Sequence, residues 1–288
     1  MFFGGHTYIT ASCTAKTMAA RFVPTHVRAA TTVVETDHER TITERDAFAS
    51  FLHRLSDLDV SSIDLQPNCA QEVSTQTLVT SETPERAESQ LERVRSAYRD
   101  TVMSVPHYDE DYGDSFPESL AEEFGPKIAA AVLTSDQLTF HLRNQLIDAT
   151  HEIRESRHTL LQGLETERTA LEAVNKNLTH LGTDLDDVLS AQSFHTWSNE
   201  DLADVRDSLR TRQQECDQLA IDRQATLQER RIPGTHHIDH EFTQYLYETL
   251  PVTYPVLTDI ASLVETLRTT QQGVERALNA RDSRNSEP

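Results

Sequence analysis

Lysine is nearly missing from this 288-residue chain, in which Lys16, Lys127 and Lys176 are the only lysines among 26 basic residues. Acidic residues number 47, so the formal net charge is −21 and the isoelectric point is about 4.9. In about 1 M salt the Debye length falls to about 3 Å, and repulsion among excess carboxylates is largely screened. Strong acidity with so little lysine therefore predicts a protein adapted to molar internal salt.

Glycine is also scarce, at eight residues, and hydrophobic residues make up 37% of the chain. Few glycines, together with apolar residues spaced by three and four, favour helices over an α/β architecture. A chain of this length can bury a sizeable core. The predicted fold class is all-α.

Long apolar runs and paired cysteines are absent as well. No run approaches the roughly 20 residues that a membrane-spanning helix needs, and the N-terminus lacks the pattern of a signal peptide. Cys13, Cys69 and Cys216 lie far apart and form neither a C-x-x-C pair nor a disulfide framework. These absences predict a cytoplasmic protein without a membrane partner.

The usual catalytic motifs are missing too. The sequence contains no G-x-S-x-G, Walker loop, G-x-G-x-x-G or C-x-x-C. Its most arginine-rich stretch, residues 206–231, is interleaved with aspartate and glutamate, so it does not form the basic patch typical of nucleic-acid binding. We therefore expect no catalytic residue, no cofactor and no nucleic-acid partner.

Helical periodicity is present in several segments of the first half. It predicts a helix from about Val27 to Leu58, a linker over 61–83, and a helix that begins at Thr83-Pro84-Glu85 and ends before Pro106. Ser115 and Glu118 form a capping box for a short helix that Gly125-Pro126 ends, and Thr134 with Gln137 is a second candidate box before the longest element.

The longest periodic segment runs from Leu138 to Leu189 without proline. Its seam positions step by three and four: Leu160, Leu164, Glu167, Leu171, Val174, Leu178, Leu181, Leu185 and Val188. A second seam follows, made of Leu202, Val205, Leu209, Arg212, Cys216 and Leu219. Two such seams joined by a turn near residues 193–194 predict an antiparallel coiled-coil hairpin in which Leu171 lies near Cys216 and Leu178 near Leu209.

The predicted architecture is thus a long antiparallel coiled-coil hairpin attached to a helical head or bundle. Its parts are a disordered extension over 1–26, a first head segment over 27–147, the hairpin over 148–231, a second head segment over 232–281 and a disordered tail over 282–288. A last helix over 256–281 needs a partner, and we expect the first helix to provide it.

Aromatic residues make up only 6% of the chain, yet several gather in the acidic stretch VPHYDEDYGDSF at 105–116. A buried core, a docking loop and a metal site would each explain this cluster. The favoured interpretation is a core shared with a second cluster near residues 242–254, since the hairpin would bring both to its base. The core or interaction candidates are Tyr108, Tyr112, Phe116, Tyr245 and Tyr254.

A metal site is the alternative explanation for His107, Asp109 and Asp111, and for His237 and His240. The first group does not match the EF-hand pattern, because Gly113 falls where an oxygen ligand belongs. Carboxylate clusters are also common by chance in so acidic a chain. We therefore predict no metal and keep these five residues as the alternative ligand set.

Three stretches carry a resemblance to known sequences. They are RTITERDAFASFL, YRDTVMSVPHYDEDYGDSFPESLAEEFGPKIAAAV and YLYETLPVTYPVLTDIASLVETLR. In these stretches the chain resembles a family of uncharacterised haloarchaeal proteins, a domain of unknown function, over about residues 27–281. The resemblance implies a salt-adapted cytoplasmic protein and transfers no catalytic residue.

The predicted function is that of a non-enzymatic helical scaffold or adaptor that acts through an unidentified protein partner. Whether the chain also forms a homo-oligomer is left open. The alternative is a metal-dependent enzyme or sensor that uses the histidine and acidic clusters of the head.

Overall fold

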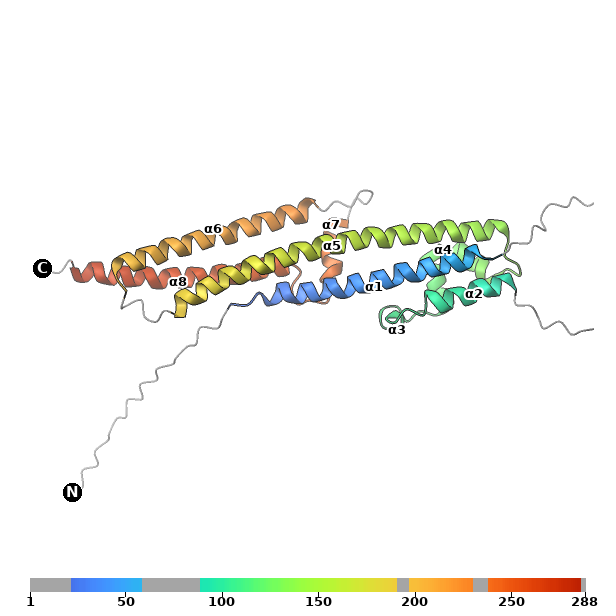
Figure 1. The fold of residues 1–288 in the computed structure, drawn as a ribbon, viewed down its shortest axis with the longest axis horizontal. Helices are drawn as coiled ribbons and strands as arrows, with labels where there is room; N and C mark the ends of the chain where they lie inside the picture. Colours follow the sequence, from blue (N-terminus) through green and yellow to red (C-terminus); the bar gives the residue numbers. More distant parts are fainter. Residues whose placement is uncertain (1–21, 59–88, 191–196, 230–237, 286–288) are drawn as a thin grey trace, which may run out of the picture. The chain divides into compact units, whose positions relative to one another are not determined.

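The structure, a computed structural model, describes residues 22–58, 89–190, 197–229 and 238–285. Within these ranges all regular secondary-structure elements are helices, which confirms the predicted all-α class (Figure 1). The helices are α1 (Thr25–Ser56), α2 (Gln90–Thr101), α3 (Tyr108–Asp111), α4 (Phe116–Thr134), α5 (Phe140–Ser190), α6 (Asn199–Glu229), α7 (Ile238–Leu246) and α8 (Pro255–Asn285). No helix in the described ranges combines the length and apolarity that crossing a membrane requires.

The chain divides into two compact units. Unit 1 comprises the described parts of Met1–Thr32 and Ala170–Pro288, and unit 2 is Val33–Thr169 without the residues between 58 and 89. This grouping differs from the predicted head and hairpin, because the two aromatic clusters fall in different units. The core that they were expected to share stays a prediction.

The helix ends of unit 2 follow from local capping. Ser89 caps α2 by accepting the backbone N–H of Glu92 at 3.1 Å, and the backbone N–H of Ser115 donates to the Glu118 carboxylate at 2.9 Å, as the predicted capping box requires. Gly125 has φ of 77° and bends α4 where the sequence predicted a break.

The start of α5 was predicted incorrectly. Thr134 is the last residue of α4, and Thr139 caps α5 by accepting the backbone N–H of Leu142 at 3.1 Å. A threonine followed three residues later by glutamine resembles a capping box, but here the threonine still belongs to the preceding helix. The predicted helix start at Thr83, the linker, and residues 1–21 and 286–288 lie outside the described residues. The remaining parts of the predicted disordered ends are not as expected, because α1 already begins at Thr25 and α8 continues to Asn285.

The core of unit 2 is built around Tyr98, which is 1% exposed. Its ring meets the rings of Phe51 at 5.4 Å, Phe124 at 5.8 Å and Phe116 at 6.0 Å between centroids. The Tyr98 hydroxyl lies 2.8 Å from the Ser119 hydroxyl, so this buried polar group is satisfied. Four helices, α1, α2, α4 and α5, contribute to this core.

Unit 1 is organised by residues at heptad spacing. In α6, Leu202, Leu209, Cys216 and Arg223 are buried at intervals of seven. In the last part of α5, Leu171, Leu178 and Leu185 repeat the same interval. Most of these positions belong to the predicted seams, so the periodicity located the buried faces correctly.

The buried face of α6 does not pack against α5 alone, as a two-helix hairpin would require. Figure 1 shows α6 running back against the direction of the last part of α5, while also lying side by side with α8. An ion pair joins Asp184 of α5 to Arg212 of α6 at 3.3 Å, although in the predicted register Asp184 faces Ala203. The register therefore differs from the prediction, and the coiled-coil hairpin itself stays a prediction.

The helix α8 contacts two elements of unit 1. Arg281, near its end, lies 3.3 Å from the Asn199 side chain at the start of α6, so the two helices are antiparallel. Near the beginning of α8, Asp259 accepts the backbone N–H of Val27 and lies beside His26, each at 2.8 Å. The expected contact with the first helix is therefore present at its N-terminus, and the packing on α6 was not predicted.

Candidate functional site

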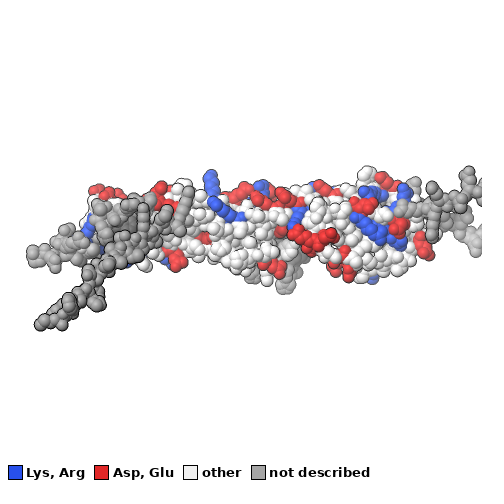
Figure 2. Space-filling view, turned by 90° about the horizontal axis from the view of Figure 1, so that it is seen from below, with Lys and Arg blue, Asp and Glu red and all other residues white. Residues whose placement is uncertain are grey.

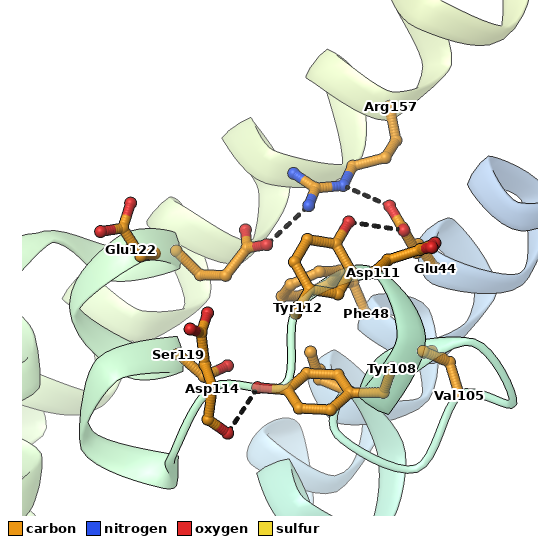
Figure 3. A pocket seen from close by; sticks show the side chains of 13 residues that line it. Glu44, Phe48, Val105, Tyr108, Asp111, Tyr112, Asp114, Ser119, Glu122 and Arg157 are labelled. Atoms are coloured by element: carbon orange, nitrogen blue, oxygen red, sulfur yellow. Dashed lines mark hydrogen bonds and ion pairs between the residues drawn. The ribbon is translucent and has the colours of Figure 1, made fainter. Parts of the chain in front are cut away.

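A cavity of about 520 Å³ in unit 2 is the best candidate for a functional site. Side chains from α1, the 102–114 segment, α4 and α5 line it (Figure 3). The lining combines aromatic rings with carboxylates and a single arginine, Arg157. The 105–114 stretch noted in the sequence forms one side of this cavity.

The local fold of that stretch positions its two tyrosines. After Pro106 the chain makes the single turn α3, and the backbone N–H groups of Tyr112 and Gly113 both donate to the carbonyl of Tyr108. Gly113 has φ of 61°, a conformation that glycine adopts readily. The turn brings the rings of Tyr108 and Tyr112 to 5.6 Å between centroids.

Arg157 of α5 lies between two glutamates from different helices. Its Nη2 donates to Glu123 of α4 at 2.6 Å, and its Nε lies 3.4 Å from Glu44 of α1. The guanidinium also lies 5.2 Å from the centre of the Phe48 ring. All three charged side chains are less than 20% exposed, so this ion-pair triad is largely desolvated.

The same Glu44 carboxylate holds the 105–114 segment against α1. The Tyr112 hydroxyl donates to its Oε1 at 2.7 Å (Figure 3). Nε2 of His107 lies 3.2 Å from the same oxygen. Arg40, also of α1, pairs with Glu110 at 3.0 Å and with Asp111 at 2.5 Å. The segment is therefore attached to α1 at several points by charge-assisted hydrogen bonds.

Burial governs the protonation of these groups. It raises the pKa of Glu123 above its ordinary value, and the nearby Arg157 partly offsets the rise. Burial would lower the pKa of Arg157, but Glu123 and Glu44 hold it above its usual range. The pKa of Tyr112 is raised by burial of its hydroxyl and by the bond to Glu44, so the phenol stays a donor.

The residues of the alternative metal site do not converge. His107 faces Glu44, Asp111 faces Arg40, and Asp109 is exposed. Across the described ranges, no three His, Cys, Asp or Glu side chains are arranged to hold a metal ion. His237 and the side chain of His240 lie outside the described residues.

The aromatic candidates of the first cluster separate into two kinds. Tyr108 is buried, and Phe116 is half-buried beside Tyr98 with the guanidinium of Arg99 4.0 Å from its ring centre. Tyr112 is 45% exposed, so the prediction that it belongs to the core is wrong. Its hydroxyl is bonded to Glu44, while the residue as a whole stays substantially exposed.

The second cluster lies in unit 1 and differs from the prediction in a similar way. Tyr245 is 66% exposed and Tyr254 is half-buried. Tyr247, which is not among the predicted core or interaction residues, is 2% exposed. Tyr245 and Tyr247 lie two residues apart in the helical turn at the end of α7, where the backbone N–H of Tyr247 donates to the carbonyl of Thr243. Two residues apart in a helix point to different sides of it. Tyr245 is thus not a core residue.

The residues of the triad were not predicted from the sequence. A signal existed for Glu44, because it precedes Phe48 by four residues on the buried stripe of α1. Arg157 likewise follows the buried Ile153 by four residues on α5. A charged residue on an apolar stripe is a usable sign of a buried ion pair, but sequence does not show which charges meet.

Comparison with known proteins identifies a family. The model of a family described as a domain of unknown function, DUF7260, matches residues 25–271, which span both units. Among curated proteins and solved structures, none matches the chain. Because the match covers most of the sequence, the chain belongs to the DUF7260 family.

Proposed function

We propose that the protein is a non-enzymatic, salt-adapted scaffold or adaptor of the cytoplasm, and that the 105–114 segment with its cavity is the surface that contacts a partner protein. The observation that carries this proposal is Tyr112, a residue that is 45% exposed while its hydroxyl is held by Glu44 at 2.7 Å. An exposed aromatic ring that is already fixed loses little conformational entropy on binding, and such rings are frequent hot spots of interfaces.

The ion pairs around the cavity support a binding surface. Glu44, Glu123 and Arg157 form ion pairs with one another, and Arg40 pairs with Asp111. Such pairing gives the segment a defined shape before a partner arrives. A metal-dependent enzyme or sensor is less well supported, because His107 and Asp111 are already bonded to other side chains.

The proposed habitat rests on charge. The chain has 47 acidic and 26 basic residues with only three lysines, which fits a cytoplasm with molar salt. Figure 2 shows acidic side chains spread along one face and basic side chains gathered in a few places among them. In such a solvent, recognition relies on aromatic contacts and short-range ion pairs more than on long-range attraction.

Capture of a partner by full-length variants tests the proposal. The tagged protein, purified in molar KCl, is used to capture partners from a high-salt lysate, beside Tyr112→Ala and the control Phe140→Ala. Phe140 is 66% exposed in the same unit and does not line the cavity. We expect Tyr112→Ala to lose a partner that wild type and the control retain, with helicity unchanged by circular dichroism. Retention by Tyr112→Ala, or loss by both variants, would contradict the assignment of this surface.

A further inference from the structure

The cavity has an excess of negative charge that its own arginine does not balance. Five carboxylates line it, those of Glu44, Asp111, Asp114, Glu122 and Glu123, against the single guanidinium of Arg157. Glu44 and Glu123 share Arg157, and Asp111 is paired with Arg40. Among the described residues, neither Asp114 nor Glu122 has an ion-pair partner, so a ligand that enters the cavity meets two unneutralised carboxylates.

Aromatic surface lies beside these carboxylates. Tyr112 is 45% exposed, and its ring packs at a tilt of 38° against that of Tyr108, which also lines the cavity. A volume of about 520 Å³ lies in the usual range of roughly 300–1,000 Å³ for ligand pockets. Carboxylates next to an aromatic face are complementary to a cation with a flat or apolar body.

Unit 2 already uses this combination for its own arginines. Arg157 lies between two glutamates and beside Phe48, and Arg99 lies 4.0 Å from the centre of the Phe116 ring and 3.6 Å from Glu92. A guanidinium pairs with carboxylates in a fixed planar geometry and stacks on aromatic rings, which a lysine ammonium does less well. The stacking component also persists at high salt, where a purely ionic contact is screened.

We propose that this cavity binds an arginine side chain presented by a partner protein. The inference rests on the proposed function and names the chemistry that the same surface recognises. The fixed ring of Tyr112 supplies the stacking face, and the two unpaired carboxylates supply the charge.

The test compares three probes in calorimetry on the full chain in KCl. They are an acetylated, amidated Gly-Arg-Gly peptide, the same peptide with neutral citrulline in place of arginine, and agmatine, a free guanidinium compound. We expect the arginine peptide to bind at least about tenfold more tightly than the citrulline peptide and more tightly than agmatine. The variant Asp114→Asn/Glu122→Gln should weaken the arginine peptide by at least about tenfold. The control Asp136→Asn/Glu152→Gln, which changes two exposed acids outside the cavity, should bind as wild type does.

Equal affinity for arginine and citrulline, or unchanged binding by the Asp114/Glu122 variant, would overturn the assignment. If agmatine binds as tightly as the arginine peptide, the proposal that the guanidinium belongs to a partner protein is wrong, and the ligand is a small free cation. The two proposals fail separately. If no arginine probe binds while Tyr112→Ala still loses its partner, the docking surface stands and the guanidinium chemistry is wrong. If the probes bind as expected while Tyr112→Ala keeps its partner, the docking surface is wrong.

Discussion

Replacing Arg157 by methionine should destabilise unit 2 by leaving two buried carboxylates without their shared cation. Methionine keeps much of the length and apolar volume of the arginine side chain, so the change removes charge rather than packing. In the native protein, Arg157 contacts Glu123 at 2.6 Å and Glu44 at 3.4 Å. In the variant the positive charge between these two glutamates is missing, so their carboxylates repel each other.

The expected cost follows from the burial of the triad. Breaking a fully buried pair by removing one partner costs roughly 3–5 kcal/mol, because the remaining charge stays desolvated. The side chains of Arg157 and Glu123 are each 19% exposed and that of Glu44 is 14% exposed, so water relieves part of this penalty. We expect a loss of about 3 kcal/mol in the free energy of unfolding at pH 7.

The cost should also depend on pH. The pKa of Glu123 is already raised by burial in the folded protein, and removing Arg157 raises it further. A carboxyl group with a raised folded-state pKa binds a proton more tightly when folded, so its destabilising effect grows as pH rises through that pKa. The difference between variant and wild type should therefore be largest at pH 7 and should shrink as pH falls toward 4.5.

Urea unfolding followed by circular dichroism at constant KCl measures this difference at several pH values. The double variant Arg157→Met/Glu123→Gln should recover part of the lost stability, because only Glu44 then remains uncompensated. A cost below about 1 kcal/mol, or one that is the same at pH 5 and pH 7, would refute the reasoning on burial and charge.

Three other expectations concern the rest of the chain. Asp259→Ala should cost about 1–2 kcal/mol, since Asp259 accepts the backbone N–H of Val27 at 2.8 Å, whereas the exposed control Glu265→Ala should change stability by less than about 0.5 kcal/mol. Burial raises the pKa of the Cys216 thiol to about 11, so Cys216 should react with iodoacetamide far more slowly in the native protein than in urea. Peptide mass spectrometry measures this labelling, and equal rates would contradict the burial of Cys216. Transfer from 2 M to 0.15 M KCl lengthens screening to about 8 Å, so circular dichroism should show lower helicity or a lower melting temperature, and an unchanged curve would refute the salt adaptation.

Local features of this protein were determined by the sequence alone. The all-α class followed from scarce glycine and from apolar spacings of three and four, because an amphipathic stripe needs no distant information. The cap at Ser115 and the bend at Gly125 were equally local, and the structure contains them. Heptad spacing also located the buried leucines of α5 and α6.

Only the tertiary structure decided which buried faces meet. A heptad stripe fits several registers and partners, so the sequence could not show that α6 packs on α8 or that Asp184 pairs with Arg212. The site depends on such long-range pairing throughout, because Glu44, Glu123 and Arg157 come from three helices and only their packing brings them together. Tyr112 was wrongly assigned to the core for the same reason. Its own loop does not show that Glu44 of α1 accepts a hydrogen bond from its hydroxyl while the residue stays 45% exposed.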